Sequence, residues 1–253
     1  LPAVGPGKSV NYWGMRTRRI PHEGGAYDEQ SVCPLADAQT IDDLEAYAWP
    51  RAEWFDYSAL REAAREAGRT HAVMCGYMAP FYYHNLLRGL ETSLVDPLID
   101  PAFTHHLLNR LSDFFYEHHR RIFEAADGAI DVAQVTDDLG SQTGPMIGMA
   151  TYREFYAPHH RRFIDLCHEF GVKVFHHDDG SCREFIPLLV EMGIDILNPI
   201  QWTCPGMDRD ELKREFGGRI CFHGGVENQR ILPFGTPEEV RAEVRRCIDT
   251  LGA

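Results

Sequence analysis

Val174-Phe-His-His-Asp-Asp-Gly180 has the composition of a buried β-strand that ends in polar, titratable side chains. Its β-branched and aromatic residues favour a strand, and Gly180 releases the chain toward a helix. In α/β folds, the side chains that bind and react gather at the carboxyl ends of parallel strands. We therefore interpret this stretch as one strand of a parallel sheet whose carboxyl end carries chemistry.

Three other strand-like runs end in the same way. Asp137-Asp138 follow one run, Asn198 and Gln201 follow another, and His223-Gly224-Gly225 follow a third. The carboxyl ends of parallel strands meet at one edge of a sheet, so these residues are predicted to form the rim of a single active site.

Strand and helix patterns alternate from His71 onward, which favours a parallel sheet. Strands are expected at 71–77, 130–136, 172–177, 195–198 and 219–223, and helices at 101–125, 151–170, 182–192, 208–216 and 237–251. Five such units are too few to close an eight-fold barrel, and an open doubly wound sheet would want a glycine-rich phosphate loop, which is absent. The pattern predicts a (β/α)8 TIM barrel that lacks N- and C-terminal parts.

The first sixty-odd residues do not show this alternation of strands and helices. Two strand-like segments, 12–20 and 27–33, flank Glu23-Gly24-Gly25 and predict a hairpin. Short helices are expected at 41–46, with Thr40 as the N-cap, and at about 58–66. We expect residues 1–253 to form one incomplete barrel domain, with 1–66 as an N-terminal hairpin and helix elaboration.

Composition excludes several classes of partner. The formal charge of −13 is unsuited to nucleic acid, whose phosphates need clustered Lys and Arg. No apolar stretch approaches the roughly 20 residues that span a bilayer, so no membrane partner is expected. The seven cysteines form no C-x-x-C pair, which favours reduced thiols. The chain starts at Leu1 without a signal-peptide profile, and we expect a fragment of a cytoplasmic protein.

His177 and Asp179 are the predicted metal ligands. Residues two apart in a strand point to the same side, and an imidazole with a carboxylate suits Zn²⁺ or another divalent metal. The third ligand is unknown. Candidates are His223, Glu227, Cys204 or a residue beyond Ala253. The alternative is a hydrogen-bonded His–Asp pair that only shapes the pocket.

Further residues are predicted to contact the substrate. Asp137 is expected to act as an acid or base or to hold a substrate cation, with Asp138 beside it; alternatively, one of these aspartates caps the following loop. Tyr82 belongs to an aromatic cluster that either lines a pocket or fills the core. The pairs 105–106, 118–119 and 159–160 are histidines within helices, and we expect them to face solvent. Gly-x-Ser-x-Gly is absent, which disfavours covalent hydrolase chemistry.

Taken together, several segments resemble the uroporphyrinogen decarboxylase superfamily. They are Pro34-Leu-Ala-Asp-Ala38 with Tyr47-Ala-Trp-Pro50, Asp137-Asp-Leu-Gly-Ser-Gln-Thr-Gly-Pro-Met146, Phe175-His-His-Asp-Asp-Gly180, Gly193-Ile-Asp-Ile-Leu-Asn-Pro-Ile-Gln201, Glu211-Leu-Lys-Arg-Glu-Phe-Gly217 and Gly224-Gly-Val-Glu-Asn-Gln229. The resemblance covers nearly all of the chain. It implies a distorted (β/α)8 barrel with the site at its C-terminal mouth, here without the opening strand or strands and the final one.

Two activities share this fold. The resemblance implies either a cofactor-free decarboxylase, which binds an acidic tetrapyrrole with arginines and one aspartate, or a cobamide-dependent methyltransferase, which uses zinc bound by His-x-Cys and a later cysteine. His177-Asp178-Asp179-Gly180 matches the His-x-Cys-Gly position, with Asp179 in place of the cysteine. The decarboxylase's arginine-rich motif is not in this chain, and an acidic mouth suits a polycarboxylate poorly.

The sequence therefore favours metal-assisted methyl transfer to or from a small-molecule substrate, with a corrinoid held by a partner protein as the possible cofactor. Asp137, His177 and Asp179 are the predicted catalytic residues. The predicted substrate-binding residues are Tyr82, Asp138, Gln142, Asn198, Gln201 and His223. The alternatives are a cofactor-free decarboxylase of porphyrin biosynthesis and a non-catalytic binding subunit.

Overall fold

The computed structural model describes residues 8–252, which divide into two compact units. The first unit comprises residues up to Asp56 together with Pro80–Arg121. The second comprises Tyr57–Ala79 and the residues from Ile122 onward. The boundary does not coincide with the elaboration expected at 1–66, and the single-domain interpretation stays a prediction.

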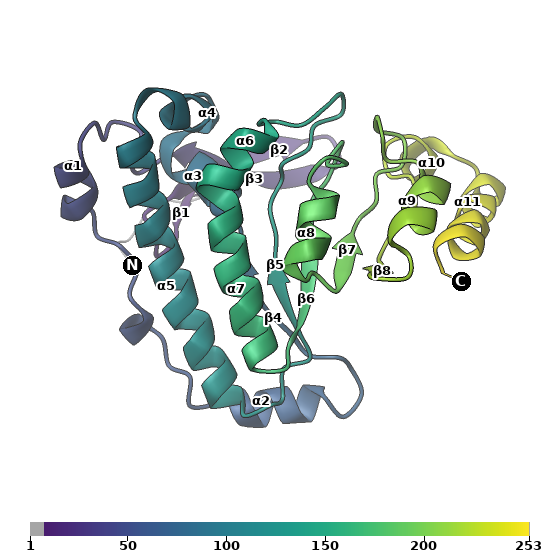
Figure 1. Cartoon of the computed structure of the whole chain (residues 1–253), viewed down its shortest axis with the longest axis horizontal. Helices are drawn as coiled ribbons and strands as arrows, with labels where there is room; N and C mark the ends of the chain where they lie inside the picture. The colour runs from purple at the N-terminus through teal and green to yellow at the C-terminus, as the bar shows by residue number, and fades with distance from the viewer. Residues whose placement is uncertain (1–7, 253) are drawn as a thin grey trace. The chain divides into compact units, whose positions relative to one another are not determined.

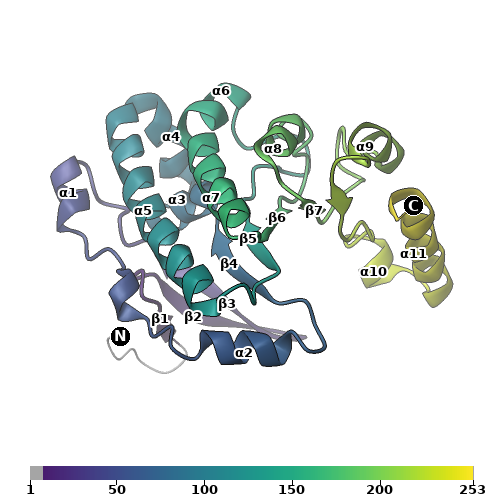
Figure 2. The ribbon, with the colours of Figure 1, turned by 60° about the horizontal axis from the view of Figure 1, so that its bottom comes forward.

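The first unit contains a three-stranded antiparallel sheet, whose strands lie side by side in Figure 2. Strands β2 (Arg16–His22) and β3 (Gly25–Val32) form the predicted hairpin, with Ile20 opposite Tyr27. Strand β1 (Lys8–Val10) pairs with β2 and was not predicted, because three residues are too short to show alternation.

The helices of the first unit include two that the sequence did not reveal. Helix α1 (Ile41–Ala46) has the predicted bounds and a capping box between Thr40 and Asp43. Between the short 3-10 helix η1 (Ala52–Trp54) and the long helix α5 (Pro101–Ala126) lie the unpredicted α3 (Pro80–Arg88) and α4 (Leu90–Ile99). The aromatic run at the start of α3 and Pro97 within α4 obscured the helical pattern.

Aromatic rings and one buried ion pair make up the centre of the first unit. Trp13 is 1% exposed and meets Phe114 edge to face at 5.1 Å. Arg88 and Asp96, both buried, form an ion pair at 2.8 Å, and the Arg88 guanidinium also donates to the carbonyls of Leu35 and Ala38. Burial of charged groups is tolerated here because each finds partners.

The second unit holds the predicted parallel sheet, in the order β4-β5-β6-β7-β8 (Figure 1). Its strands are β4 (Met74–Met78), β5 (Val132–Val135), β6 (Lys173–His177), β7 (Ile196–Asn198) and β8 (Cys221–Phe222). Each overlaps its predicted range and is shorter than it, with β4 starting three residues later and ending one residue beyond. The described part of the chain does not close this sheet into a barrel, so β4 and β8 are its edges.

Helices connect these strands as the alternation predicted. The elements are α2 (Leu60–Ala67), α6 (Met149–Thr151), the π-helix η2 (Tyr152–Tyr156), α7 (Ala157–Glu169), α8 (Ile186–Met192), α9 (Arg209–Phe216), α10 (Ile231–Phe234) and α11 (Pro237–Leu251). Helix α7 packs on β5 and β6, and α7 and α8 lie in front of the sheet in Figure 1. The helix expected over 151–170 is interrupted by the π-helix, a form that often marks functional sites. Among residues 8–252, none of the helices is long and apolar enough to cross a membrane.

Candidate active site at the carboxyl end of the parallel sheet

The strand ends of the second unit meet through backbone hydrogen bonds. The amide of Asp137 donates to the carbonyl of His177 at 3.0 Å, and the amide of Asp178 donates to the carbonyl of Asn198 at 2.9 Å. The amide of His223 donates to the carbonyl of Leu197, also at 2.9 Å. These bonds continue the parallel ladder past the last strand residues. They bring the four predicted strand ends together at one edge of the sheet.

His177 is held by the side chain of Asn198. Its Nδ1 lies 2.6 Å from Oδ1 of Asn198, and the amide nitrogen of Asn198 lies 2.8 Å from Nδ1 of His223. An amide oxygen can only accept, so His177 donates from Nδ1 and keeps its lone pair on Nε2. Nε2 faces Oδ1 of Asp138 at 3.6 Å. The amide therefore fixes the ring orientation and tautomer, which is how metal-binding or acid–base histidines are prepared.

Asp138 is the carboxylate paired with His177, and its side chain is 44% exposed. Burial raises the pKa of Asp138, opposed by the nearby His177, while Asp137 and Asp179 raise it further. The carboxylate of Asp179 accepts from the amide of Gly180 at 3.3 Å. The prediction that His177 and Asp179 act together as metal ligands stays a prediction, and the structure adds the carboxyl group of Asp138 beside the His177 ring.

Two loops form the floor of the site in direct backbone contact. A Cβ on Gly140 would lie 2.3 Å from the carbonyl oxygen of Asp179, and a Cβ on Gly180 would lie 2.6 Å from that of Ser141. Only glycine fits at either position, and Gly180 also has φ +75°. The amide of Ser181 donates to the carbonyl of Ser141 at 2.8 Å. The sequence showed these glycines but not that they face one another.

Gln142 and Gln201 join the same two loops. The Gln201 amide donates to Oε1 of Gln142 at 2.8 Å, and its own Oε1 accepts from the amide of Gly180 at 2.9 Å. Ile200, which precedes Gln201, has φ 63°, a conformation that β-branched residues rarely adopt. Gln201 is buried and Gln142 exposed. Gln142 is thus the member of the pair that a substrate could reach.

Asp137 lies behind this surface. It is 1% exposed, and its Oδ2 lies 3.2 Å from Nε2 of His160, which is fully buried. Nδ1 of His160 lies 2.9 Å from the hydroxyl of Tyr152, on the π-helix. The prediction that His159-His160 and His119 face solvent was wrong, because these side chains are buried. No local pattern distinguishes His160 from a solvent-facing histidine, since its partner Asp137 is distant in sequence.

A second buried pair supports the loops. Oδ1 of Asp178 accepts from the amides of Leu139 at 2.9 Å and Gly140 at 3.2 Å. Oδ2 of Asp178 lies 3.7 Å from Nε2 of His176, and neither atom has a hydrogen-bond partner among the described residues. Burial raises the pKa of Asp178, and nearby Asp137 adds to this; burial likewise lowers the pKa of His176. Both groups are therefore driven toward their neutral forms.

Two candidates for the third metal ligand, Glu227 and Cys204, already have other contacts. The carboxylate of Glu227 accepts from the amides of Gln229, Arg230 and Ile231 and so caps α10. The Cys204 thiol is buried beside Gln142, at 3.6 Å, and burial raises its pKa, as does Asp179. Across residues 8–252, no three His, Cys, Asp or Glu side chains are grouped as a metal centre requires. The donors with suitable chemistry are Nε2 of His177 and the neighbouring aspartates.

Tyr82 belongs to the other compact unit, on α3, where its ring meets that of Tyr83 edge to face at 6.1 Å. Its predicted contact with substrate stays a prediction.

Comparisons with known proteins identify the family. The profile of the uroporphyrinogen decarboxylase (URO-D) family matches residues 13–253. The chain belongs to this family. The methylated-thiol–coenzyme M methyltransferase of Methanosarcina mazei is 28% identical over 174 residues, which are 67% of this chain and 43% of that protein. The uroporphyrinogen decarboxylase of Xanthomonas axonopodis pv. citri is 27% identical over 156 residues, 59% of this chain and 40% of that protein.

A solved structure agrees with the family fold. A methyltransferase from Methanosarcina mazei matches 88% of this chain and 63% of its own with a TM-score of 0.66 and 16% identity. The barrel-type URO-D fold predicted from the sequence is thereby confirmed, with five of its parallel strands present and no closed barrel among residues 8–252. Against each of the two curated URO-D relatives, this chain spans less than half the length.

Proposed function

We propose that this URO-D family chain belongs to an enzyme that transfers a methyl group, with the chemistry at His177. The observation that carries the proposal is the Asn198–His177–Asp138 arrangement. The amide of Asn198 locks the proton on Nδ1, so Nε2 presents a lone pair toward the exposed carboxylate of Asp138. Such a nitrogen is prepared to accept a proton or to bind a metal ion.

The charge at the sheet end supports methyl transfer over porphyrinogen decarboxylation. Asp138 and Asp179 are the partly exposed carboxyl groups at this edge, while Asp137 and Asp178 are buried behind it. A substrate with several carboxylates would be repelled by ionised groups in this position, whereas a thiol, a thioether or an amine would not. One relative is a methylated-thiol methyltransferase, in keeping with this chemistry.

In the proposed enzyme, His177 and Asp179 would hold a divalent metal ion, such as zinc, together with a third ligand that is not grouped with them among residues 8–252. Bound there, the metal would polarise the sulfur or nitrogen of the substrate as a Lewis acid. Asp138 accepts the proton that the substrate heteroatom loses. Gln142 and His223, both exposed, orient the substrate, and Asn198 and Gln201 hold His177 and Gly180 in place. A corrinoid on a partner protein would carry the methyl group.

The buried groups position this surface. Asp137, with His160 and Tyr152 behind it, sets the end of β5 from which Asp138 projects. Asp178 holds the amides of Leu139 and Gly140 and so the start of the loop that carries Gln142. Asp137 was predicted to be catalytic; in the proposed mechanism it acts through Asp138.

The test is metal content and methyl transfer in the intact protein, purified without chelator. We expect near-stoichiometric zinc or another divalent ion in the wild type and its loss in His177→Ala and Asp179→Ala. Methyl transfer from methylcobalamin to a thiol such as coenzyme M is expected to fall with it. His71→Ala, at an exposed histidine away from this edge, is the control and should keep both properties.

Unchanged metal content and turnover in His177→Ala would overturn the proposal. A second candidate is a cofactor-free decarboxylase, which the similarity to the Xanthomonas enzyme supports. Decarboxylation of uroporphyrinogen with no metal present would establish it. Binding of a corrinoid protein without transfer to any acceptor would instead indicate a non-catalytic subunit.

A further inference from the structure

The first unit contains an apolar hollow of about 450 Å³ that is separate from the sheet-end site. Its lining residues are Val10, Asn11, Tyr12, Gly14, Arg16, Tyr47, Ala48 and Trp54, all from residues before Asp56. This volume lies within the range of small-molecule sites. Three of the eight lining residues are aromatic, so the hollow offers flat faces rather than flexible aliphatic chains.

The aromatic walls are held in place by contacts outside the hollow. Tyr12 meets Phe55 edge to face at 5.2 Å, and Tyr47 meets Trp49 in the same way at 5.1 Å. The hydroxyl of Tyr47 donates to the carbonyl of Trp13. Trp54, by contrast, is 54% exposed, which is unusual for so large an apolar side chain. Two walls are thus fixed and the third presents its ring to solvent.

Arg16 is the charged residue of this hollow. Within the described chain, its guanidinium has neither a carboxylate at ion-pair distance nor an aromatic ring beneath it, unlike Arg18 on the same strand, which pairs with Glu29 at 2.7 Å. The polar group of Asn11 is already used, because its Oδ1 accepts from the amides of Trp13 and Met15. Arg16 is exposed, so water solvates its guanidinium, and the group is available to form charge-assisted hydrogen bonds with an anionic ligand in the hollow.

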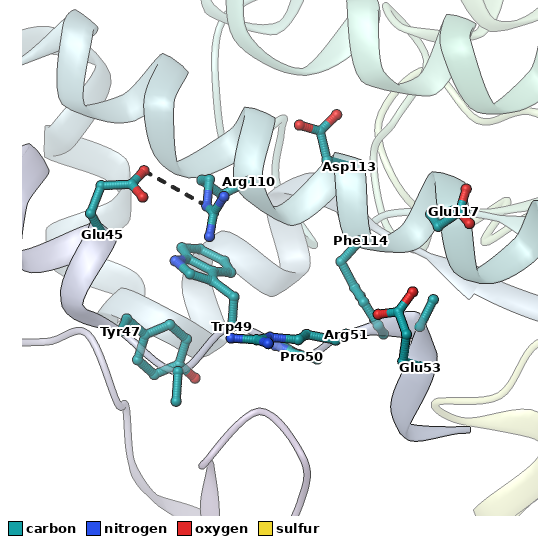
Figure 3. Close-up of a pocket in the computed structure, with 12 residues that line it drawn as sticks. Glu45, Tyr47, Trp49, Pro50, Arg51, Glu53, Arg110, Asp113, Phe114 and Glu117 are labelled. Carbon is teal, nitrogen blue, oxygen red and sulfur yellow. Dashed lines mark ion pairs between the residues drawn. The ribbon is translucent and has the colours of Figure 1, made fainter. Parts of the chain in front are cut away.

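A neighbouring hollow in the same unit differs in the charge of its lining residues. It shares Tyr47 and Ala48 but is lined by several charged residues (Figure 3). Its carboxylates already have partners: Glu45 pairs with His106 at 2.6 Å and lies 3.8 Å from Arg110, and Glu117 pairs with Arg120 at 2.9 Å. The neighbouring hollow thus contains carboxylates of its own, whereas the lining of the hollow beside Arg16 includes none.

We propose that the hollow formed by Tyr12, Tyr47, Trp54 and Arg16 binds a small, flat molecule that carries a single carboxylate. The ring lies against Trp54 and between the two tyrosines, and the carboxylate pairs with the Arg16 guanidinium. Aromatic walls favour a planar body by stacking, and a planar guanidinium favours a carboxylate by two parallel hydrogen bonds. The proposal is independent of the chemistry at His177.

Three probes with the same ring and different charge test it by calorimetric titration of the intact protein. They are 2-naphthoate, 2-naphthamide and 2-naphthylmethylamine. We expect saturable one-to-one binding that is tightest for the carboxylate. Arg16→Gln should weaken 2-naphthoate at least about tenfold and leave 2-naphthamide nearly unchanged, in line with the strength of a charge-assisted hydrogen bond. Trp54→Ala should weaken all three probes.

Arg51→Gln is the matched control, because Arg51 lines the neighbouring hollow and not this one. Equal binding of the carboxylate and the amide, or no saturable binding at all, would overturn the proposal. If Arg51→Gln abolishes the binding of 2-naphthoate and Arg16→Gln does not, the ligand binds in the neighbouring hollow, and the proposal is overturned. A wild type that self-associates on gel filtration, while Trp54→Ala does not and neither binds a probe, would show that a second copy covers the hollow.

Discussion

His119 illustrates how one buried side chain makes stability depend on pH. It is 2% exposed, burial lowers its pKa to about 3, and its Nδ1 bonds the carbonyl of Phe115 at 2.8 Å. The ordinary histidine pKa is 6.5, so between these values the unfolded chain binds a proton that the folded chain does not. Stability is therefore fully present above about pH 6.5 and lost as the pH falls.

We expect this single group to cost about 2 kcal/mol of stability at pH 5 relative to neutral pH. His119→Gln should flatten the pH dependence of unfolding between pH 7 and pH 4, even if it lowers stability at neutral pH. His71→Gln, at an exposed position, should leave the slope as in the wild type. Urea denaturation at several pH values measures this. Parallel curves for His119→Gln and the wild type would contradict it.

Asn198 orients the ring of His177. Substitutions of Asn198 can distinguish its contact with His177 from its contact with His223. Asn198→Ala removes the acceptor for Nδ1 of His177 and also the donor to His223. We expect turnover to fall about 10- to 100-fold, the usual cost of losing a group that orients a functional histidine. Asn198→Asp keeps an acceptor for His177 and loses only the donor, so it should retain more activity. Equal loss in both variants would show that the His223 contact matters instead.

At the scale of elements, the two loops that follow β5 and β6 fit together through their glycines. Gly140→Ala would place a Cβ 2.3 Å from a backbone oxygen, and Gly180→Ala adds a left-handed conformation, which costs about 1–2 kcal/mol by itself. We expect each variant to be destabilised by at least about 2 kcal/mol, because backbone cannot move aside as a flexible side chain can.

Gly144→Ala is the matched control in the same loop, since a Cβ there would meet nothing within 4 Å. Thermal unfolding and limited proteolysis of the loop at 139–145 distinguish the variants. If Gly140→Ala and Gly144→Ala are equally stable and equally resistant, the loops do not pack as described.

Elements with strong local patterns matched their prediction, and weaker ones did not. Helix α11 begins at Pro237 and ends at Leu251 as expected, because Thr236 and Glu239 form a capping box and the apolar period is regular. Helix α3 was missed because the aromatic run in its first turn was interpreted as a pocket wall or core cluster, although Pro80 at its first position is a helix-start signal. The π-helix Tyr152–Tyr156 was not predicted, because the apolar pattern over 151–170 is that of one continuous helix.

At the scale of the whole molecule, each compact unit holds its own buried arginine–carboxylate pair. Arg88 and Asp96 lie in the first unit, and Arg209 and Glu243, at 2.8 Å, lie in the second. Asp96→Ala or Glu243→Ala leaves an arginine buried without its partner, which costs about 3–5 kcal/mol. We expect hydrogen–deuterium exchange to rise most in the unit that lost its carboxylate.

Asp96→Asn and Glu243→Gln, which keep acceptor oxygens, should show smaller increases. A rise that is uniform over both units for either alanine variant would contradict the expectation. It would indicate that the two units unfold as one cooperative whole.

The sequence by itself determined the alternating strands and helices, the hairpin, the family and the edge of the sheet where polar residues gather. These properties depend on periodicity, caps and turns among residues close in sequence. Only the tertiary structure decided that His177 lies beside Asp138, that Asp137 and His160 are buried together, and that Gly140 opposes Gly180. Each of these contacts joins different strand ends or helices, and its geometry depends on packing that no local pattern encodes.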